Sequence, residues 1–312
     1  GHAGSPMLFF AIFILLTAVV VMLGVQKGVE KVSKLMMPVL LILIVGISIY
    51  TLTLPGAIDG LIYYVKPDFN QFSIKTVIAA VGQLFYSMSL AMGIMITYGS
   101  YMRKEDNIES SVRQIEVFDT LVAFLSGLII VPAVFVFSGG DENALNAGPS
   151  LMFITLPNVF KEMLGGQIVG AVFFLLVVLA AMTSSISLME TVVSIVEERF
   201  HWKRIPSCLI VTGISFLIGL LSVFGYSIWS DFTIFHMQFL DFFDYISNNI
   251  MMPIVALMTC VLVGFVVKTT FVEDEIEKNT RFRAKGLYRV MIKFICPICM
   301  LLILFSALFL KL

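Results

Sequence analysis

Eight apolar segments of this chain are each near or above the length that crosses a lipid bilayer. They cover about residues 8–24, 35–54, 76–101, 114–138, 167–196, 206–225, 241–266 and 287–310. A helix rises ~1.5 Å per residue, so roughly 20 residues span the hydrocarbon core. No polar domain separates the segments. We therefore expect residues 7–312 to form a single all-α integral membrane domain with eight transmembrane helices.

Composition supports a membrane protein and limits the chemistry available to it. Hydrophobic residues make up 59% of the chain and charged residues 13%, whereas about a quarter of an ordinary soluble domain is charged. The four cysteines all lie in apolar runs, and Cys296 and Cys299 have no acidic or histidine cluster beside them. We interpret them as buried small hydrophobes, not as disulfides or metal ligands. Residues 1–6 resemble an expression or cleavage scar.

Basic residues predict the orientation of the segments. Of the 20 Lys and Arg residues, 15 lie in the connections after the first, third, fifth and seventh segments. An excess of positive charge marks the cytoplasmic side. Both ends of the chain are therefore expected outside the cell, in a multi-pass protein of the cytoplasmic membrane. Because no signal peptide precedes an outside N-terminus, we expect an odd number of spans before residue 7 that this sequence does not include.

The third segment contains GQLFYSMSLAMG (residues 82–93), which is rich in helix-weakening residues. Its two glycines and two serines lower helix propensity and offer hydroxyls beside loosened backbone. A helix that opens near Ser87–Gly93 would present free carbonyl groups and two helix ends to an ion or substrate. Close packing of small residues against another helix is the alternative.

The fourth segment carries an acid, Asp119, inside apolar sequence. A carboxylate within a span costs about 2.5 kcal/mol or more, so it needs a cation or a hydrogen-bond partner. The alternative is a residue that caps the helix at the interface, near Arg113 and Glu116.

The fifth segment places oxygen-bearing side chains on one helical face. Thr183, Ser187 and Glu190 are spaced by four and three residues. The Ala180 carbonyl with the Thr183 and Ser184 hydroxyls would suit sodium, which prefers oxygen ligands. A hydroxyl-lined contact between helices is the alternative.

Four motifs together resemble the neurotransmitter:sodium symporter family, whose members are sodium-coupled amino-acid transporters with the LeuT fold. The motifs are GQLFYSMSLAMG, GPSLMFITLP (148–157), AAMTSSISLMET and LDFFDYISNN (240–249). The resemblance aligns the eight segments with helices four to eleven of the LeuT-type inverted-repeat fold. It also makes 139–165 an outer loop, which we expect to form a re-entrant or surface helical hairpin. The family's first three helices have no counterpart in this sequence.

The resemblance implies two sodium sites. Ser87 and Asp119 would bind the first sodium ion, although the family pattern has Asn in place of Asp119. Ala180, Thr183 and Ser184 would bind the second. Because Asp119 adds a fixed negative charge and Ala123 lacks a hydroxyl to hold chloride, chloride is not expected as a cofactor.

The resemblance also implies substrate and gate residues. Tyr86 would be an aromatic lid, and backbone near Ser87 and Ser89 would hold the polar end of the amino acid. Met92, Ser184 and Leu188 would shape the side-chain pocket, and the flexible Met92 favours a large apolar or aromatic substrate. The gate residues would be Asp244 on the outer side and Tyr101 and Glu198 on the inner side.

We therefore expect the parent protein to be a chloride-independent sodium:amino-acid symporter that works by alternating access. Without the first three helices, this chain would be a truncated fragment that cannot transport by itself. The alternative function is a non-transporting membrane scaffold, or a fragment that dimerises through its terminal helices without binding ions. An enzyme is not expected, because His201 and His236 lie at segment ends and the pattern of paired acids is missing. The expected partners are the amino acid, the bilayer and a possible homodimer mate, with no nucleic acid.

Overall fold

The computed structural model describes residues 4–67, 69, 72–139, 151–229, 231–235 and 237–310. Within these residues the chain is helical, apart from one isolated bridge between Ile234 and Met237. Seven helical segments in the described part are long and apolar enough to cross a membrane: Gly4–Met22, Val25–Leu52, Ile108–Phe137, Gly166–Phe200, Arg204–Gly225, Phe239–Val266 and Lys285–Leu308. The other expected span, 76–101, is divided into the shorter helices α4 and α5.

Most of the long spans begin or end within a few residues of the predicted limits. The α-helices of the first five long spans are α1 (Gly4–Met22), α2 (Lys31–Leu52), α6 (Ile108–Phe137), α8 (Gly166–Phe200) and α9 (Arg204–Gly225). The last two long spans contain α10 (Phe239–Asp244), α11 (Met252–Val261), α13 (Lys285–Val290) and α14 (Cys296–Phe305). The shorter helices are α3 (Ala57–Val65), α4 (Ile74–Ser87), α5 (Ile94–Ser100), α7 (Leu156–Glu162) and α12 (Thr269–Glu277).

Several spans contain π-helical stretches. These are Val25–Glu30, Leu151–Thr155, Tyr245–Met251, Leu262–Val266, Met291–Ile295 and Ser306–Leu310. Hydropathy does not distinguish a π-helical turn from an α-helical one, so the sequence predicted only continuous spans there. Helix α1 begins at Gly4, which makes Gly4–Pro6 its first turn. Proline is tolerated there because a first-turn N–H has no partner within the helix. That residues 1–6 are a scar stays a prediction.

The chain divides into two compact units, and each is described by itself. The first unit comprises Gly1–Gly24, Ser73–Glu116 and Ile186–Leu312. The second unit comprises Val25–Phe72 and Val117–Ser185.

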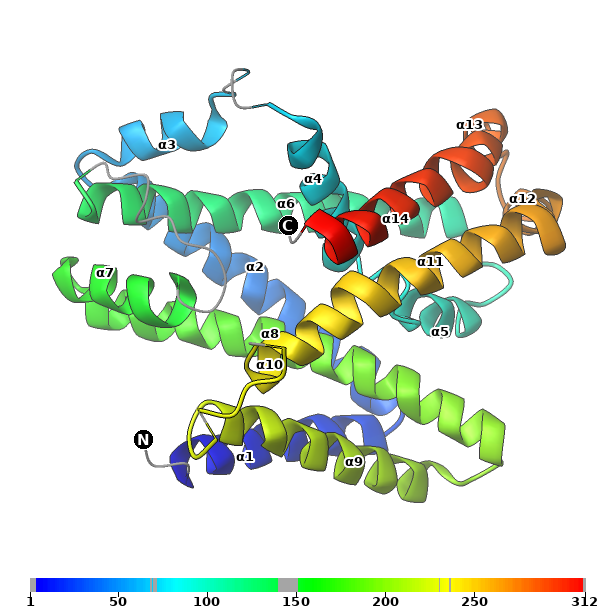
Figure 1. The fold of residues 1–312 in the computed structure, drawn as a ribbon, viewed down its shortest axis with the longest axis horizontal. Coiled ribbons are helices and arrows are strands. Elements are labelled where there is room, and N and C mark those ends of the chain that lie inside the picture. Colours follow the sequence, from blue (N-terminus) through cyan, green and yellow to red (C-terminus); the bar gives the residue numbers. More distant parts are fainter. Residues whose placement is uncertain are drawn as a thin grey trace. The chain divides into compact units, whose positions relative to one another are not determined.

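In the first unit, helices distant in sequence pack in pairs. Helix α1 lies beside α9, and α11 lies beside α14, which also contacts α4 (Figure 1). Between α1 and α9, the Phe10 and Phe216 rings stack with centroids 5.5 Å apart.

The second unit is built around a core shared by α2, α6, α7 and α8. Its buried residues include Ile44, Ile129, Leu156, Phe160 and Phe173. Helix α7 comes from the predicted outer loop, and it inserts Leu156 and Phe160 into this core. The beginning of that loop, including Gly148 and Pro149 of the sequence motif, lies outside the described residues. That residues 139–165 form a helical hairpin therefore stays a prediction.

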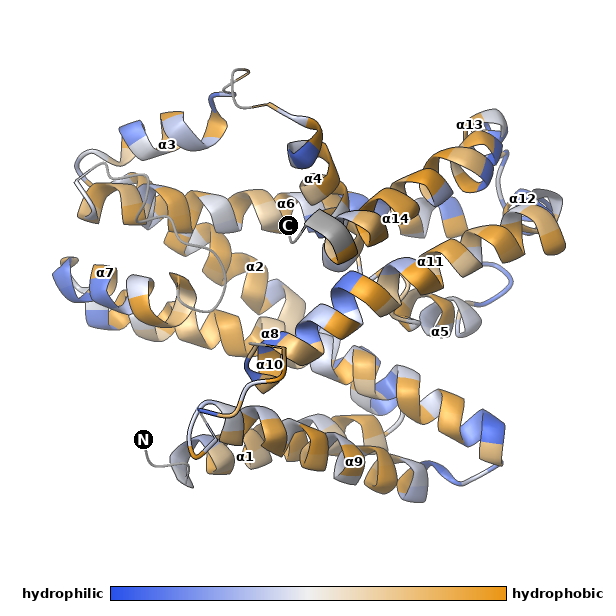
Figure 2. Cartoon of the chain, in the orientation of Figure 1, coloured by the Kyte–Doolittle hydropathy of each residue, from blue (hydrophilic) through white to orange (hydrophobic). Residues whose placement is uncertain are grey.

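The spans turn most of their apolar side chains outward. In the most apolar 18-residue window of each span, only 17–33% of the residues are buried. Hydrophobic residues predominate along α9, α11 and α14 (Figure 2). Such a surface would be unfavourable in water, and it is what hydrocarbon requires.

The close approach of α3 to α6 gives a test of packing in the second unit. A Cβ added at Gly60 would lie 2.7 Å from the Pro132 Cα and 3.0 Å from the Phe135 Cβ. Backbone cannot yield as a flexible side chain does, and such overpacking costs about 1–3 kcal/mol. We expect Gly60→Ala to lower the thermal unfolding midpoint in detergent. The matched control is Gly46→Ala in α2, where a Cβ meets nothing within 4 Å. Equal midpoints for the two variants would contradict this packing.

Candidate functional site

The apolar span at 76–101 is interrupted by six residues that are not helical. Helix α4 ends at Ser87 and α5 begins at Ile94. Between them, Ser89, Ala91 and Gly93 have φ angles of 54°, 62° and 80°. A non-glycine residue in this left-handed region costs of order 1–3 kcal/mol and is found mainly where structure serves function. The break is therefore a candidate functional site. It lies in the segment for which the sequence predicted a weak helix.

The break leaves backbone polar groups available for a ligand. The Met88 N–H donates to the Leu84 carbonyl and the Leu90 N–H to the Phe85 carbonyl, both at 3.0 Å. In the described part of the chain, no donor pairs with the carbonyl oxygens of Met88, Ser89 or Leu90. Buried backbone groups without partners are costly in hydrocarbon. A cation or an ammonium group would be a suitable partner for these oxygens.

Four of the predicted substrate residues of the first unit lie in or directly beside this break. Ser89 and Met92 are half-buried within it, while Tyr86 and Ser87 are exposed at the end of α4. Helix α8 reaches the other end of the break, because a Cβ at Gly93 would lie 3.0 Å from the Thr191 methyl group. Leu188, one turn before Thr191, is exposed on α8. Thus α5 begins against α8 in the first unit.

The residues predicted for the second sodium site lie on α8 within the second unit. The Thr183 hydroxyl donates to the Ala180 carbonyl at 2.9 Å, so these two oxygens are adjacent. Ser184 is exposed on the neighbouring face. Asp119, half-buried on α6, also belongs to the second unit, whereas Ser87 belongs to the first. Their joint binding of one ion stays a prediction.

The predicted gate residues differ in their surroundings. Asp244 is exposed at the end of α10 and accepts a 2.6 Å hydrogen bond from the Asn248 side-chain amide. Glu198 is exposed near the end of α8 and forms no ion pair with a described residue. Tyr101 follows α5 directly, and its hydroxyl donates to the Glu190 carboxylate at 2.8 Å. Tyr101 is therefore held by Glu190 on α8.

Glu190 is the centre of a buried ionic network that sequence reasoning missed. Its side chain is 0% exposed and forms an ion pair with Arg204 at the start of α9. Arg204 also contacts Glu197 at 3.3 Å, and its Nε and Nη2 donate to the Val21 carbonyl at 2.9 and 2.7 Å. The network thus joins the ends of α1, α5, α8 and α9 within the first unit.

A signal for this network was present in the sequence. Glu190 belongs to the oxygen-lined face of the fifth segment, and Arg204 is one of the basic residues in the connection that follows it. An ionised carboxylate within a span requires a cation, and Arg204 follows after the short connection between α8 and α9. Tyr98 adds a further polar contact, because its hydroxyl donates to the Ser187 hydroxyl at 2.6 Å.

Oxygen atoms that could bind a cation occur at two places along the chain. Among the described residues, no group of three or more His, Cys, Asp or Glu that could hold a metal ion is found. Carbonyl and hydroxyl oxygens, which the break and the Ala180–Thr183 turn provide, are ligands for hard cations such as sodium.

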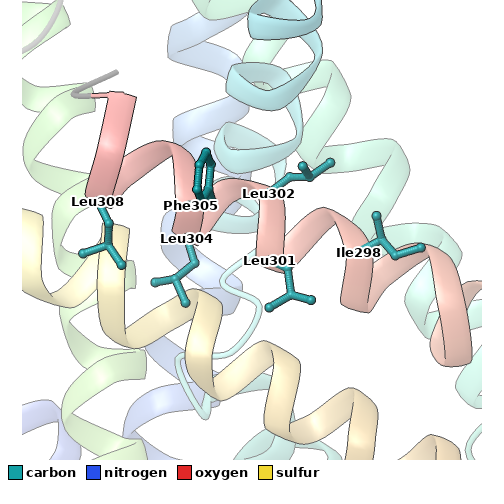
Figure 3. A pocket seen from close by; sticks show the side chains of 6 residues that line it. All are labelled: Ile298, Leu301, Leu302, Leu304, Phe305 and Leu308. Carbon is teal, nitrogen blue, oxygen red and sulfur yellow. The ribbon is translucent and has the colours of Figure 1, made fainter.

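An apolar pocket lies on the span Lys285–Leu308 and differs in its chemistry from the break. It has a volume of about 430 Å³, and Figure 3 shows the side chains that line it: Ile298, Leu301, Leu302, Leu304, Phe305 and Leu308. Because it presents hydrocarbon alone, it fits neither an ion nor the charged ends of an amino acid.

Comparison with known proteins identifies relatives across the whole chain. The family model described as the sodium:neurotransmitter symporter family matches residues 1–311. An uncharacterized sodium-dependent transporter of Haemophilus influenzae is 33% identical over 99% of this chain and 67% of its own length. The sodium-dependent nutrient amino acid transporter 1 of Drosophila grimshawi is 25% identical over 96% of this chain and 47% of its own length.

A solved structure with a similar fold is the crystal structure of MhsT in complex with L-phenylalanine. Its TM-score is 0.85 at 32% identity, over 97% of this chain and 68% of MhsT. This match agrees with the expected LeuT fold. The chain spans about two thirds or less of the length of these three relatives.

The Glu190–Arg204 pair gives a second test. We expect Arg204→Met to destabilise the protein by about 3–5 kcal/mol, because it leaves a buried carboxylate without its cation. The double variant Glu190→Gln/Arg204→Met should cost less than the sum of its two single variants. Chemical unfolding in detergent measures both. The control is Lys34→Met, which removes the exposed Lys34–Glu30 pair and should cost about 1 kcal/mol or less. A mild effect of Arg204→Met, equal to that of the control, would refute the network's role.

Proposed function

We propose that this chain, which belongs to the sodium:neurotransmitter symporter family, is part of a transporter that couples the movement of sodium to amino-acid uptake. The observation that carries the proposal is the break at Met88–Gly93 inside an apolar span. Helix breaks near the bilayer midplane are where secondary transporters bind ions and substrates. Because the chain spans only part of its relatives, the activity, substrate and partners are proposed for the whole protein.

Sodium is proposed to bind at two places. Ser87 and Asp119 would supply oxygens to the first ion, with the carboxylate adding a fixed negative charge. The Ala180 carbonyl and the hydroxyls of Thr183 and Ser184 would supply oxygens to the second. The 2.9 Å contact between the Thr183 hydroxyl and the Ala180 carbonyl supports the second site, because it places two of the proposed oxygen ligands next to each other.

The proposed substrate is a large apolar or aromatic amino acid. Free carbonyls of the break suit its ammonium group, next to Ser87 and Ser89. Tyr86 would cover it, and the flexible Met92, with Ser184 and Leu188, would accommodate its side chain. The phenylalanine bound to MhsT supports this substrate class. Chloride is not proposed as a co-ion, because Asp119 supplies the negative charge and Ala123 has no hydroxyl.

Transport is proposed to proceed by alternating access in the cytoplasmic membrane. Asp244 would form part of the outer gate, and Tyr101 and Glu198 part of the inner gate. The hydrogen bond of Tyr101 to Glu190 supports a gate position that is fixed by the ionic network. Outside location of both chain ends, homodimerisation and the absence of the first three family helices stay predictions.

Sodium should stabilise the purified protein by mass action. At about 100 times its dissociation constant, a ligand of the folded state adds ~2.7 kcal/mol. We expect the thermal midpoint to rise in sodium relative to equal potassium, and Thr183→Val to reduce the rise. The control is Thr259→Val, because the Thr259 hydroxyl also donates to a carbonyl of its own helix, at 2.8 Å from Val255.

Transport by the complete protein tests the proposed coupling of amino-acid uptake to sodium. Uptake of labelled phenylalanine into proteoliposomes should collapse when potassium replaces sodium and should not change when gluconate replaces chloride. Sodium-independent uptake would refute the coupling. Absence of both uptake and sodium stabilisation would instead indicate a non-transporting scaffold.

A further inference from the structure

A basic pocket lies in the first unit, between the end of the span Phe239–Val266 and the beginning of the span Lys285–Leu308. Its volume is about 390 Å³, within the ~300–1,000 Å³ range of small-molecule sites. The residues that line it are Gly264, Phe265, Lys268, Thr269, Thr270, Arg289 and Lys293. Three of these side chains are cationic, two carry hydroxyls, and none is acidic.

The local packing brings Lys293 to this pocket. A Cβ on Gly264 would lie 3.4 Å from the Lys293 Cγ, an ordinary van der Waals contact, so the lysine stem packs beside the segment that contains Gly264. Lys293 is half-buried and lies inside the span Lys285–Leu308. A lysine at such a depth extends its charge toward the membrane surface, where Lys268 is exposed.

Arg289 is held in place by an acid outside the pocket lining. Its Nε and Nη2 donate to the two oxygens of Glu273 at 2.8 and 2.6 Å, and the Glu273 side chain is only 3% exposed. These hydrogen bonds lower the pKa of Glu273, so it stays ionised at neutral pH. Two of the five guanidinium N–H groups are used in this pair.

The pocket therefore has a surplus of positive charge. Glu273 balances Arg289, whereas Lys268 and Lys293 form no ion pair with a described residue. The Thr269 side chain is hydrogen-bonded to Glu273. The expected ligand is thus an anion with several acceptor oxygens, to which the lysine and arginine groups and the Thr270 hydroxyl can donate.

Apolar surface adjoins this charge. Phe265 lines the pocket and is 55% exposed, and Val266 and Phe294 are similarly exposed within the spans. A soluble anion would leave this surface without a partner, whereas a lipid would place its acyl chains against it. By the charge bias of the connections, this end faces the cytoplasmic leaflet, whose anionic lipids attract lysine and arginine.

We propose that this pocket binds the phosphate group of an anionic phospholipid such as phosphatidylglycerol. Lys268, Arg289 and Lys293 hold the phosphate, and Phe265 contacts the first carbons of an acyl chain. This site is separate from the break between α4 and α5. It does not depend on transport, because it requires only that the two spans cross a membrane.

Native mass spectrometry of the purified protein, titrated with phosphatidylglycerol and with phosphatidylcholine, tests the site. Each interfacial lysine contributes about a factor of five in affinity for an anionic lipid, so Lys268→Gln/Lys293→Gln should bind phosphatidylglycerol about 25-fold more weakly. Affinity for phosphatidylcholine should not change. Lys31→Gln/Lys104→Gln removes the same charge from exposed sites elsewhere and should bind like the unaltered protein.

A charge-conserving variant and a soluble phosphate complete the test of the site. Lys268→Arg/Lys293→Arg keeps the charge and should retain binding, which separates loss of the site from loss of fold. Equal phosphatidylglycerol affinity in the Gln variant and the unaltered protein overturns the site. Glycerol 3-phosphate without lipid should neither bind at matched concentration nor displace phosphatidylglycerol. If it binds as tightly as the lipid, the ligand is a soluble phosphate and the lipid assignment is wrong.

Discussion

The structure depends on the requirement that backbone polar groups find partners where water is absent. In the described part of the chain, seven long helical spans meet it through the hydrogen bonds of their own helices, which prolines such as Pro38 and Pro132 interrupt locally. Between α4 and α5 it is not met internally, because the carbonyls of Met88, Ser89 and Leu90 pair with no described donor. Left-handed backbone at Ser89 and Ala91 adds a further cost. In the proposed transporter, a bound cation and the ammonium group of an amino acid would offset both costs.

Glu190 is also a buried polar group that needs partners, and it finds them within the protein. Its buried carboxylate is satisfied by Arg204 and Tyr101, and Arg204 in turn satisfies the Val21 carbonyl at the end of α1. Removing Arg204 would leave the buried Glu190 carboxylate without its cation, so this arginine connects the ends of α1, α8 and α9. The opened backbone of the break and the closed ionic network lie at the two ends of α5. If a ligand binds at the break as proposed, α5 is anchored at one end by the ionic network and at the other by that ligand.

The amino-acid sequence predicted the structural features that depend on neighbouring residues along the chain. Length and hydropathy indicated the spans, and the glycines and serines of residues 82–93 indicated the segment where α4 ends. Tertiary contacts were not predictable in this way. The partner of Glu190 required knowledge that α9 begins beside α8, and the position of Lys293 required the close approach of Gly264. The pairing of Ser87 with Asp119 rests on family resemblance alone, since these residues belong to separate units.

Hydrogen–deuterium exchange at the amides of residues 88–93 tests the central claim most directly. The account predicts that sodium with phenylalanine slows this exchange at least about tenfold relative to potassium, a difference of ~1.4 kcal/mol. Amides of the second-unit core, such as Ile44 and Ile129, should exchange at the same rate in both ions. Exchange at residues 88–93 that is equal in sodium and potassium, in a folded and complete transporter, would contradict a ligand site at the break.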